Sequence, residues 1–166
     1  MLIQGVLMYK KLAVLYIAIF LIGCTAAVKQ PVQPQRTSVL INVSKDKVWS
    51  LLVTEVGLKF PVQAIEKDSG LISTQFVNMP VGFNNMGVER YAYQPSGFLY
   101  TWSGLRMTMR IMAVESEPNQ TMISINAHYE AYESNFSHSW MVIRSNGAVE
   151  NRILTNIEQK IRSTAH

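Results

Sequence analysis

The stretch Leu105-Arg-Met-Thr-Met-Arg-Ile-Met-Ala-Val114 alternates apolar side chains with Arg106, Thr108 and Arg110. Side chains of a β-strand point alternately to its two faces, so this run predicts a strand with one face in a core and the other in water. The turn residues Glu117-Pro-Asn-Gln120 come next, followed by a second alternating run. Its apolar residues are Ile123, Ile125, Ala127, Tyr129 and Ala131, and Ser124, Asn126, His128 and Glu130 face the other way. The two runs predict an antiparallel pair.

Two segments have the period of a helix instead. In Lys45–Val56, apolar residues recur at spacings of three and four; Ser44 stands at the N-cap position and Gly57 at the end. We expect Trp49 within it to be a core residue. A second apolar stripe follows Ser145-Asn-Gly147 and predicts a long C-terminal helix. The stripe consists of Val149, Ile153, Leu154, Ile157 and Ile161.

Shorter β-rich runs surround these elements. Ser38–Val43 and Trp140–Arg144 predict the first and last strands, and the turn Glu66–Gly70 predicts a hairpin. Proline cannot donate to a strand ladder, so Pro61 indicates either a sheet edge or the end of a strand. The remaining expected segments are the hairpin strands Phe60–Ala64 and Ile72–Phe76, the further strands Val88–Gln94 and Phe98–Ser103, and a bulge or bend at Gly104.

Helices at both ends of an antiparallel run of strands predict an α+β fold. We expect two layers, with the sheet curling round the C-terminal helix. About 143 residues follow Gly23, which is enough for one domain of ordinary size, so residues 37–166 are interpreted as a single domain.

The N-terminal residues have the layout of a secretory signal. Lys10 and Lys11 precede the apolar run Leu12–Ile22, and the tetrapeptide Leu21-Ile-Gly-Cys24 resembles the lipobox of bacterial lipoproteins. A transmembrane anchor is the first alternative, but the apolar run is shorter than the roughly 20 residues that a membrane-spanning helix needs. The second alternative is an ordinary signal peptide that happens to be followed by a cysteine. We therefore expect a signal peptide at 1–23, acyl chains such as palmitate on Cys24, and a tether at 24–36 with Pro31 and Pro34.

Several of these features together resemble the BamC family, the lipoprotein subunits of the machinery that assembles outer-membrane β-barrels. They are the lipobox, the proline-bearing tether, the helix with Val48 and Trp49, the hairpin Glu66-Lys-Asp-Ser-Gly-Leu-Ile-Ser-Thr74, and the last strand leading through Ser145-Asn-Gly147 into an apolar helix. The resemblance implies a two-layer helix-grip domain. Because Thr25 follows the cysteine, where inner-membrane lipoproteins of this kind carry aspartate, it also implies the periplasmic face of the outer membrane.

Composition excludes some classes of function. Cleavage before Cys24 removes Lys10 and Lys11 from the 15 basic residues and leaves all 11 acidic ones, so the net charge falls to about +2. No basic run follows, and we expect no nucleic-acid partner. Cys24 is the single cysteine, so an exported location brings no disulfide framework.

The sequence contains no catalytic motif, and we expect no enzymatic activity, no metal and no cofactor beyond the acyl chains on Cys24. His128, Glu130 and His138 are the weak candidates for a metal site. The ordinary alternative is a solvated strand face on which Glu130 pairs with Arg106 or Arg110.

The expected function is that of a lipid-anchored envelope protein that binds other proteins or assists their assembly near the outer membrane. The alternative is a binder of a lipid or another hydrophobic small molecule, because methionines such as Met107 and Met109 line adaptable apolar cavities as well as cores. The loop Met79–Gly87 is unusually apolar and is expected either to contact a partner or to cap the domain. Its candidate partner-binding residues are Pro80, Val81, Phe83 and Met86.

Overall fold

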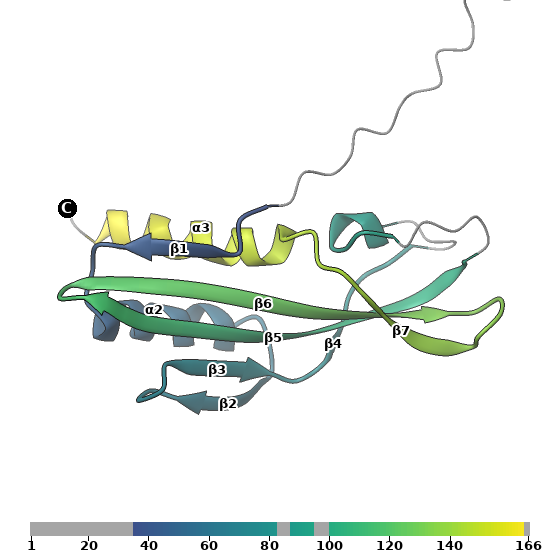
Figure 1. Cartoon of the computed structure of the whole chain (residues 1–166), viewed down its shortest axis with the longest axis horizontal. Coiled ribbons are helices and arrows are strands. Elements are labelled where there is room, and N and C mark those ends of the chain that lie inside the picture. Colours follow the sequence, from purple (N-terminus) through teal and green to yellow (C-terminus); the bar gives the residue numbers. More distant parts are fainter. Residues whose placement is uncertain (1–34, 83–86, 95–99, 165–166) are drawn as a thin grey trace, which may run out of the picture. The chain divides into compact units, whose positions relative to one another are not determined.

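The computed structural model describes residues 35–82, 87–94 and 100–164. Within them, one antiparallel sheet of seven strands carries two α-helices on the same face (Figure 1). The expected α+β class is therefore confirmed, with the C-terminal helix packed on the sheet. In chain order the elements are β1 (Ser38–Ile41), α2 (Lys45–Gly57), β2 (Val62–Glu66), β3 (Leu71–Thr74), β4 (Val77–Asn78), η1 (Val88–Arg90), β5 (Trp102–Glu117), β6 (Gln120–Glu133), β7 (Ser139–Ile143) and α3 (Ala148–Ser163).

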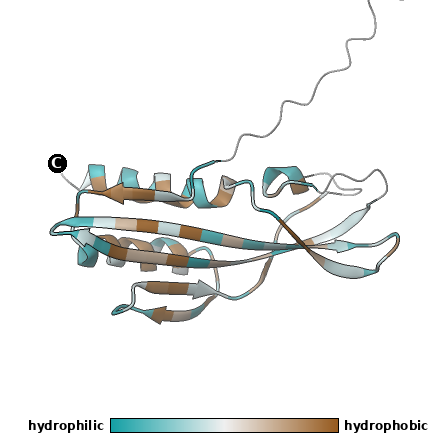
Figure 2. Ribbon diagram, viewed as in Figure 1, coloured by the Kyte–Doolittle hydropathy of each residue, from teal (hydrophilic) through white to brown (hydrophobic). Residues whose placement is uncertain are grey.

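The predicted central pair is confirmed as β5 and β6, which are joined by the two-residue turn Pro118-Asn119. The ladder shifts register between Trp102 and Gly104, which bears out the bulge expected there. Figure 2 shows brown and teal residues alternating along both strands. Met107, Met109 and Ile111 are at most 1% exposed and face the helices. Arg106, Thr108 and Arg110 point to the other face.

The remaining strands extend the sheet on both sides in the order β1-β6-β5-β3-β2. Strand β4 pairs with β5 beyond the end of β3, and β7 pairs with β6 beyond β1. Strand β2 is at an edge and begins at Val62, directly after Pro61, so both positions considered for this proline apply. The hairpin turn is tightly packed, because Gly70 has φ +75° and the Ala113 N–H donates to its carbonyl oxygen at 2.9 Å.

Both predicted helices are present and close the core over the sheet. From α2 come Val48, Trp49, Leu52 and Val56, all buried, so Trp49 is the core residue that its spacing indicated. From α3 come Val149, Ile153, Leu154 and Ile157. Ser44 does stand at the N-cap of α2, but its side chain makes no capping hydrogen bond.

One strand prediction was wrong and another was right only in part. Val88–Gln94 contains the 3₁₀ helix η1 and a single bridge from Ala92 to Ser145. The buried residues Val88, Tyr91 and Ala92 have spacings of three and one, so the period is that of a helical turn and not of a strand. The predicted hairpin is present, but its second strand is shorter than expected, because β3 ends at Thr74 and Phe76 is 46% exposed on the other face.

The predicted signal peptide at 1–23, Cys24 and most of the predicted tether at 24–36 lie outside the described residues. The last two residues of the expected tether do have described contacts, since Arg36 pairs with Glu158 at 2.5 Å and Gln35 accepts from Asn151 at 3.0 Å, both on α3. None of the helices in the described ranges combines the length and the apolar character needed to span a membrane.

Candidate functional site

One face of the sheet has no α-helix of the described chain on it, and we call it the uncovered face. It consists of the outward-pointing side chains of the strands. Register places Arg106 opposite Glu130, Thr108 opposite His128 and Arg110 opposite Asn126 across β5 and β6. This polar pattern is what the sequence predicted. The apolar residues among these polar ones are the unexpected part.

Three of the outward side chains form what we call the arginine stack: Phe76, Arg106 and Trp140. The guanidinium carbon of Arg106 lies 4.2 Å from the centroid of the Trp140 ring and 4.6 Å from that of Phe76. Each contact contributes roughly 0.5 to 2 kcal/mol, depending on desolvation. Tyr132 meets Trp140 edge to face at 5.5 Å between centroids. The stack therefore displays aromatic surface in a fixed arrangement.

The carboxylate of Glu130 binds the guanidinium of the arginine stack. Its Oε2 accepts from the guanidinium of Arg106 at 2.5 and 2.6 Å, which confirms one of the two pairings expected for it. His128 Nε2 lies 3.2 Å from Oε1 of the same carboxylate. Burial alone would raise the pKa of Glu130, but the hydrogen bonds from Arg106 and His128 outweigh burial and lower it. Glu130 therefore stays ionised and holds Arg106 between the two rings.

The predicted metal candidates do not form a cluster. His128 and Glu130 are adjacent, but the third candidate, His138, lies beyond the turn that follows β6. No group of three His, Cys, Asp or Glu side chains suited to a metal occurs in residues 35–82, 87–94 and 100–164.

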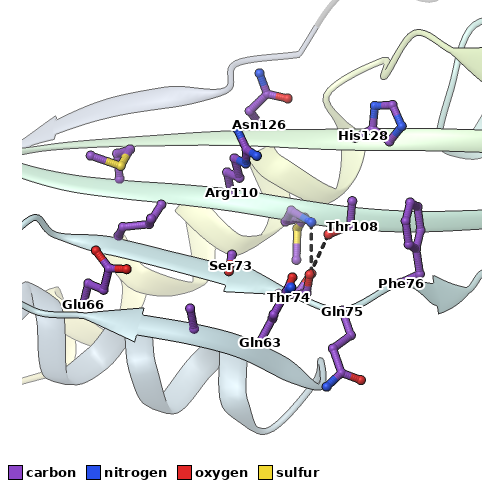
Figure 3. Close-up of a pocket in the computed structure, with 14 residues that line it drawn as sticks. Gln63, Glu66, Ser73, Thr74, Gln75, Phe76, Thr108, Arg110, Asn126 and His128 are labelled. Carbon is purple, nitrogen blue, oxygen red and sulfur yellow. Dashed lines mark hydrogen bonds between the residues drawn. The ribbon is translucent and has the colours of Figure 1, made fainter.

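A groove runs from the stack across the same face (Figure 3). Its volume is about 1270 Å³, and its walls come from β2, β3, β5 and β6. In Figure 3, Phe76 and His128 lie at one end, with Ser73, Arg110 and Asn126 further along. The hydroxyl of Thr108 donates to the carbonyl of Thr74 at 2.6 Å and ties β3 to β5 beneath the groove. Polar and apolar side chains both line the groove, and it lies on the uncovered face. It is therefore a surface channel and not an apolar cavity under the helices.

A second apolar row crosses the far end of the uncovered face. Met122 lies opposite Leu40 on one side and Val114 on the other. All three are between 39 and 48% exposed. Together with the arginine stack they leave apolar surface at both ends of the face, separated by polar residues.

The turn after β6 is also rigidly built. Glu133 is fully buried and accepts the backbone N–H groups of Asn135, Phe136 and Ser137 at 2.5 to 2.9 Å. Burial alone would raise its pKa, but these backbone donors lower it to about 2. The turn presents Phe136, which is 62% exposed, on a backbone that is hydrogen-bonded to Glu133.

The loop predicted to bind a partner is described only in part. Pro80 is exposed, whereas Val81 is half-buried and packs against the core cluster. Phe83 and Met86 lie outside the described residues, so their role stays a prediction. The choice between a partner-binding loop and a capping loop therefore stays open.

Sequence reasoning missed the arginine stack. Phe76, Arg106 and Trp140 come from segments that are distant in the sequence, and only the strand register brings them together. Comparison with protein-family models and with curated proteins finds no match to this chain.

Proposed function

We propose that this chain is a non-enzymatic lipoprotein of the cell envelope whose helix-grip-like domain binds other proteins. In this proposal, acyl chains on Cys24 hold it at the periplasmic face of the outer membrane, as the lipobox-like tetrapeptide and the resemblance to BamC suggest. The uncovered face is then the binding surface. The apolar loop that contains Pro80 and Phe83 is a second contact.

The observation that supports this function best is the arginine stack on a sheet face that no helix of the described residues covers. Residues that dominate binding energy at protein interfaces are enriched in Trp, Tyr and Arg, and they work best when their positions are fixed beforehand. Arg106 is held by Glu130, and Trp140 by Arg106 and Tyr132. An ordered aromatic surface of this kind binds a protein partner without a large cost in side-chain entropy.

The alternative, a lipid bound between sheet and helices, receives less support. Leu52, Ile111 and Leu154 meet there and are each fully buried. The groove of about 1270 Å³ lies on the opposite, uncovered face, and its lining includes Ser73, Thr108 and Arg110. Both observations favour recognition at the surface over capture of a greasy ligand inside.

The experiment is an affinity pull-down of the full-length lipoprotein from detergent-solubilised envelopes, with Trp140→Ser as the variant. Leu58→Ser is the matched control, because Leu58 is 78% exposed at the end of α2, away from the uncovered face. We expect Trp140→Ser to lower the yield of co-purified protein severalfold, with a stability loss of about 1 to 2 kcal/mol from the lost ring contacts. Leu58→Ser should leave both unchanged. Equal yields from both variants and the parent chain would reject the uncovered face as the binding surface.

A further inference from the structure

Strand β6 has two different neighbours along one of its edges. Strand β1 pairs with residues Thr121–Ser124, and β7 pairs with Tyr129–Glu133. Ile125 still donates its N–H to Thr37 at 2.8 Å. Between these two pairings, Asn126, Ala127 and His128 have no strand beside them on this edge within the described chain. The sheet therefore contains an opening, which we call the window.

The window is closed on its outer side. The Gln35 N–H donates to the Asn146 carbonyl at 3.1 Å, so the chain entering β1 and the chain leaving β7 meet there. The approach at Gly147 is close: its φ is +81°, and a Cβ atom on it would lie 2.6 Å from the Gln35 carbonyl oxygen. Because these two chain segments bound the window, a strand from another protein cannot pair with β6 there. It holds a cavity of about 480 Å³, within the ~300 to 1,000 Å³ range of small-molecule sites.

The window lies beside the groove of the uncovered face and reaches through the sheet to the first turn of α3. Asn126 and His128 line both hollows, and Glu150 of α3 lines the window. Glu150 is 1% exposed. The cavity thus joins a solvent-facing mouth to a buried carboxylate.

That carboxylate is only half satisfied. Its Oε1 accepts from the Ser145 hydroxyl at 2.6 Å, whereas its Oε2 is buried and receives no hydrogen bond from the described residues. The buried hydroxyl of Tyr129 also lacks a partner among them. Leaving such groups unpaired costs roughly 1 to 3 kcal/mol each, more for a charge, so each needs an explanation. Burial, and then the nearby charge of Glu150, raise the pKa of Tyr129, which places the two groups within electrostatic reach.

We propose that the window binds a small molecule that carries a primary ammonium group and an anionic group, with Oε2 of Glu150 as the acceptor for the ammonium. A buried carboxylate needs a hydrogen-bond donor, and a positively charged donor such as an ammonium also offsets its charge. Arg144 at the cavity wall provides a positive charge for the other end of the ligand. An anion at the start of α3 fits less well, because Gly147 and Ala148 already donate their N–H groups to Ser145 and Asn146. This proposal is independent of the protein-binding function. Free amino acids and the headgroup of an aminophospholipid both carry an ammonium group and an anionic group of this kind.

The test is an NMR titration of the ¹⁵N-labelled full-length chain in detergent with two matched pairs of compounds. Glycine is compared with its N-trimethyl counterpart betaine, and O-phosphorylethanolamine with phosphocholine, because the trimethylated compounds keep both charges and lose every N–H donor. We expect saturable shifts of the amides at 125–128 and 145–150 with glycine or phosphorylethanolamine, and none with its counterpart. Dissociation constants should be roughly millimolar, as for other ligands of few atoms. Whichever of the two binds identifies the source as an amino acid or a lipid headgroup.

Variants extend the test. Glu150→Gln should weaken binding at least tenfold, whereas Glu115→Gln, which removes the same charge from an exposed position on β5, should not. The matched compounds on the unmodified chain decide the question even if Glu150→Gln does not fold. Absence of saturable shifts, which would mean that water alone fills the window, overturns the proposal. Equal shifts with the trimethylated compounds, or unchanged affinity in a folded Glu150→Gln, overturn it as well.

Discussion

Lys160 of α3 donates to Oε2 of Glu55 in α2 at 2.7 Å. Glu55 is only 4% exposed, and it also pairs with Lys59 and accepts from the side-chain amide of Asn156 at 2.7 Å. The carboxylate is thus surrounded by donors from both helices. This cluster ties together the two elements that cover the core side of the sheet.

Glu55→Gln should lower the free energy of unfolding at neutral pH by roughly 1 to 3 kcal/mol, the usual cost of losing charged hydrogen bonds at a buried site. Burial alone would raise the pKa of Glu55, but Lys160, Lys59 and Asn156 lower it to about 2. Its pKa in the unfolded chain is about 4.3. The ionised carboxylate therefore contributes its stability above pH ~4.3 and loses it as the pH falls toward 2.

The measurement is chemical denaturation of the parent chain and of Glu55→Gln between pH 7 and pH 2. The difference between their unfolding free energies should be constant down to about pH 4.5 and then shrink. A difference that stays the same at pH 2 would show that the charge of Glu55 is not what stabilises the helix pair.

Gly70→Ala should be strongly destabilising. A Cβ atom at this position would lie 2.1 Å from the Ala113 carbonyl oxygen, and the φ of +75° is itself unfavourable for alanine. We expect a loss of at least about 2 kcal/mol, measured as the shift in a urea unfolding curve. Gly57→Ala is the control, since nothing lies within 4 Å of a Cβ there and alanine favours the helix by up to about 1 kcal/mol. Similar effects from both substitutions would contradict the described packing of the hairpin turn.

The anchor can be tested by metabolic labelling with palmitate. Cys24 is the single cysteine of the chain, so Cys24→Ser should abolish incorporation of the label. Two or more acyl chains, each contributing about 0.8 kcal/mol per buried methylene, hold a protein stably on a bilayer. Retention in the membrane fraction does not decide the point, because an uncleaved signal can also hold the chain there. Label recovered in the serine variant would contradict the lipoprotein interpretation.

The sequence predicted most of the regular elements because their periodicity is strong and local. Strands β5 and β6 alternate over many residues, and the stripe Val149–Ile161 repeats over about three helical turns. The prediction failed where the signal was short. The chain leaves β3 after Thr74 and joins β4 at Val77. The alternation of core-facing and outward side chains shifts by one residue between these strands, so Phe76 lies on the uncovered face and not in the core.

The candidate sites could not be read from the sequence for a different reason. The arginine stack depends on the register that brings Phe76, Arg106 and Trp140 together, and register is a tertiary property. The window depends on β1 and β7 pairing with separate parts of one edge of β6 and leaving the residues between them without a neighbouring strand. Only the pairing of Glu130 with a strand arginine could be anticipated, because opposite charges on facing positions of adjacent strands attract.

Site-specific photo-crosslinking in intact cells is the most direct test of the central claim that the uncovered face binds protein. A photoreactive amino acid at Val142, which is 67% exposed and lies opposite Glu130 on this face, is compared with one at Leu58, which is 78% exposed at the end of α2. We predict discrete crosslinked proteins from position 142 and few or none from position 58. Crosslinks of equal yield from both positions, or from position 58 alone, would contradict the account.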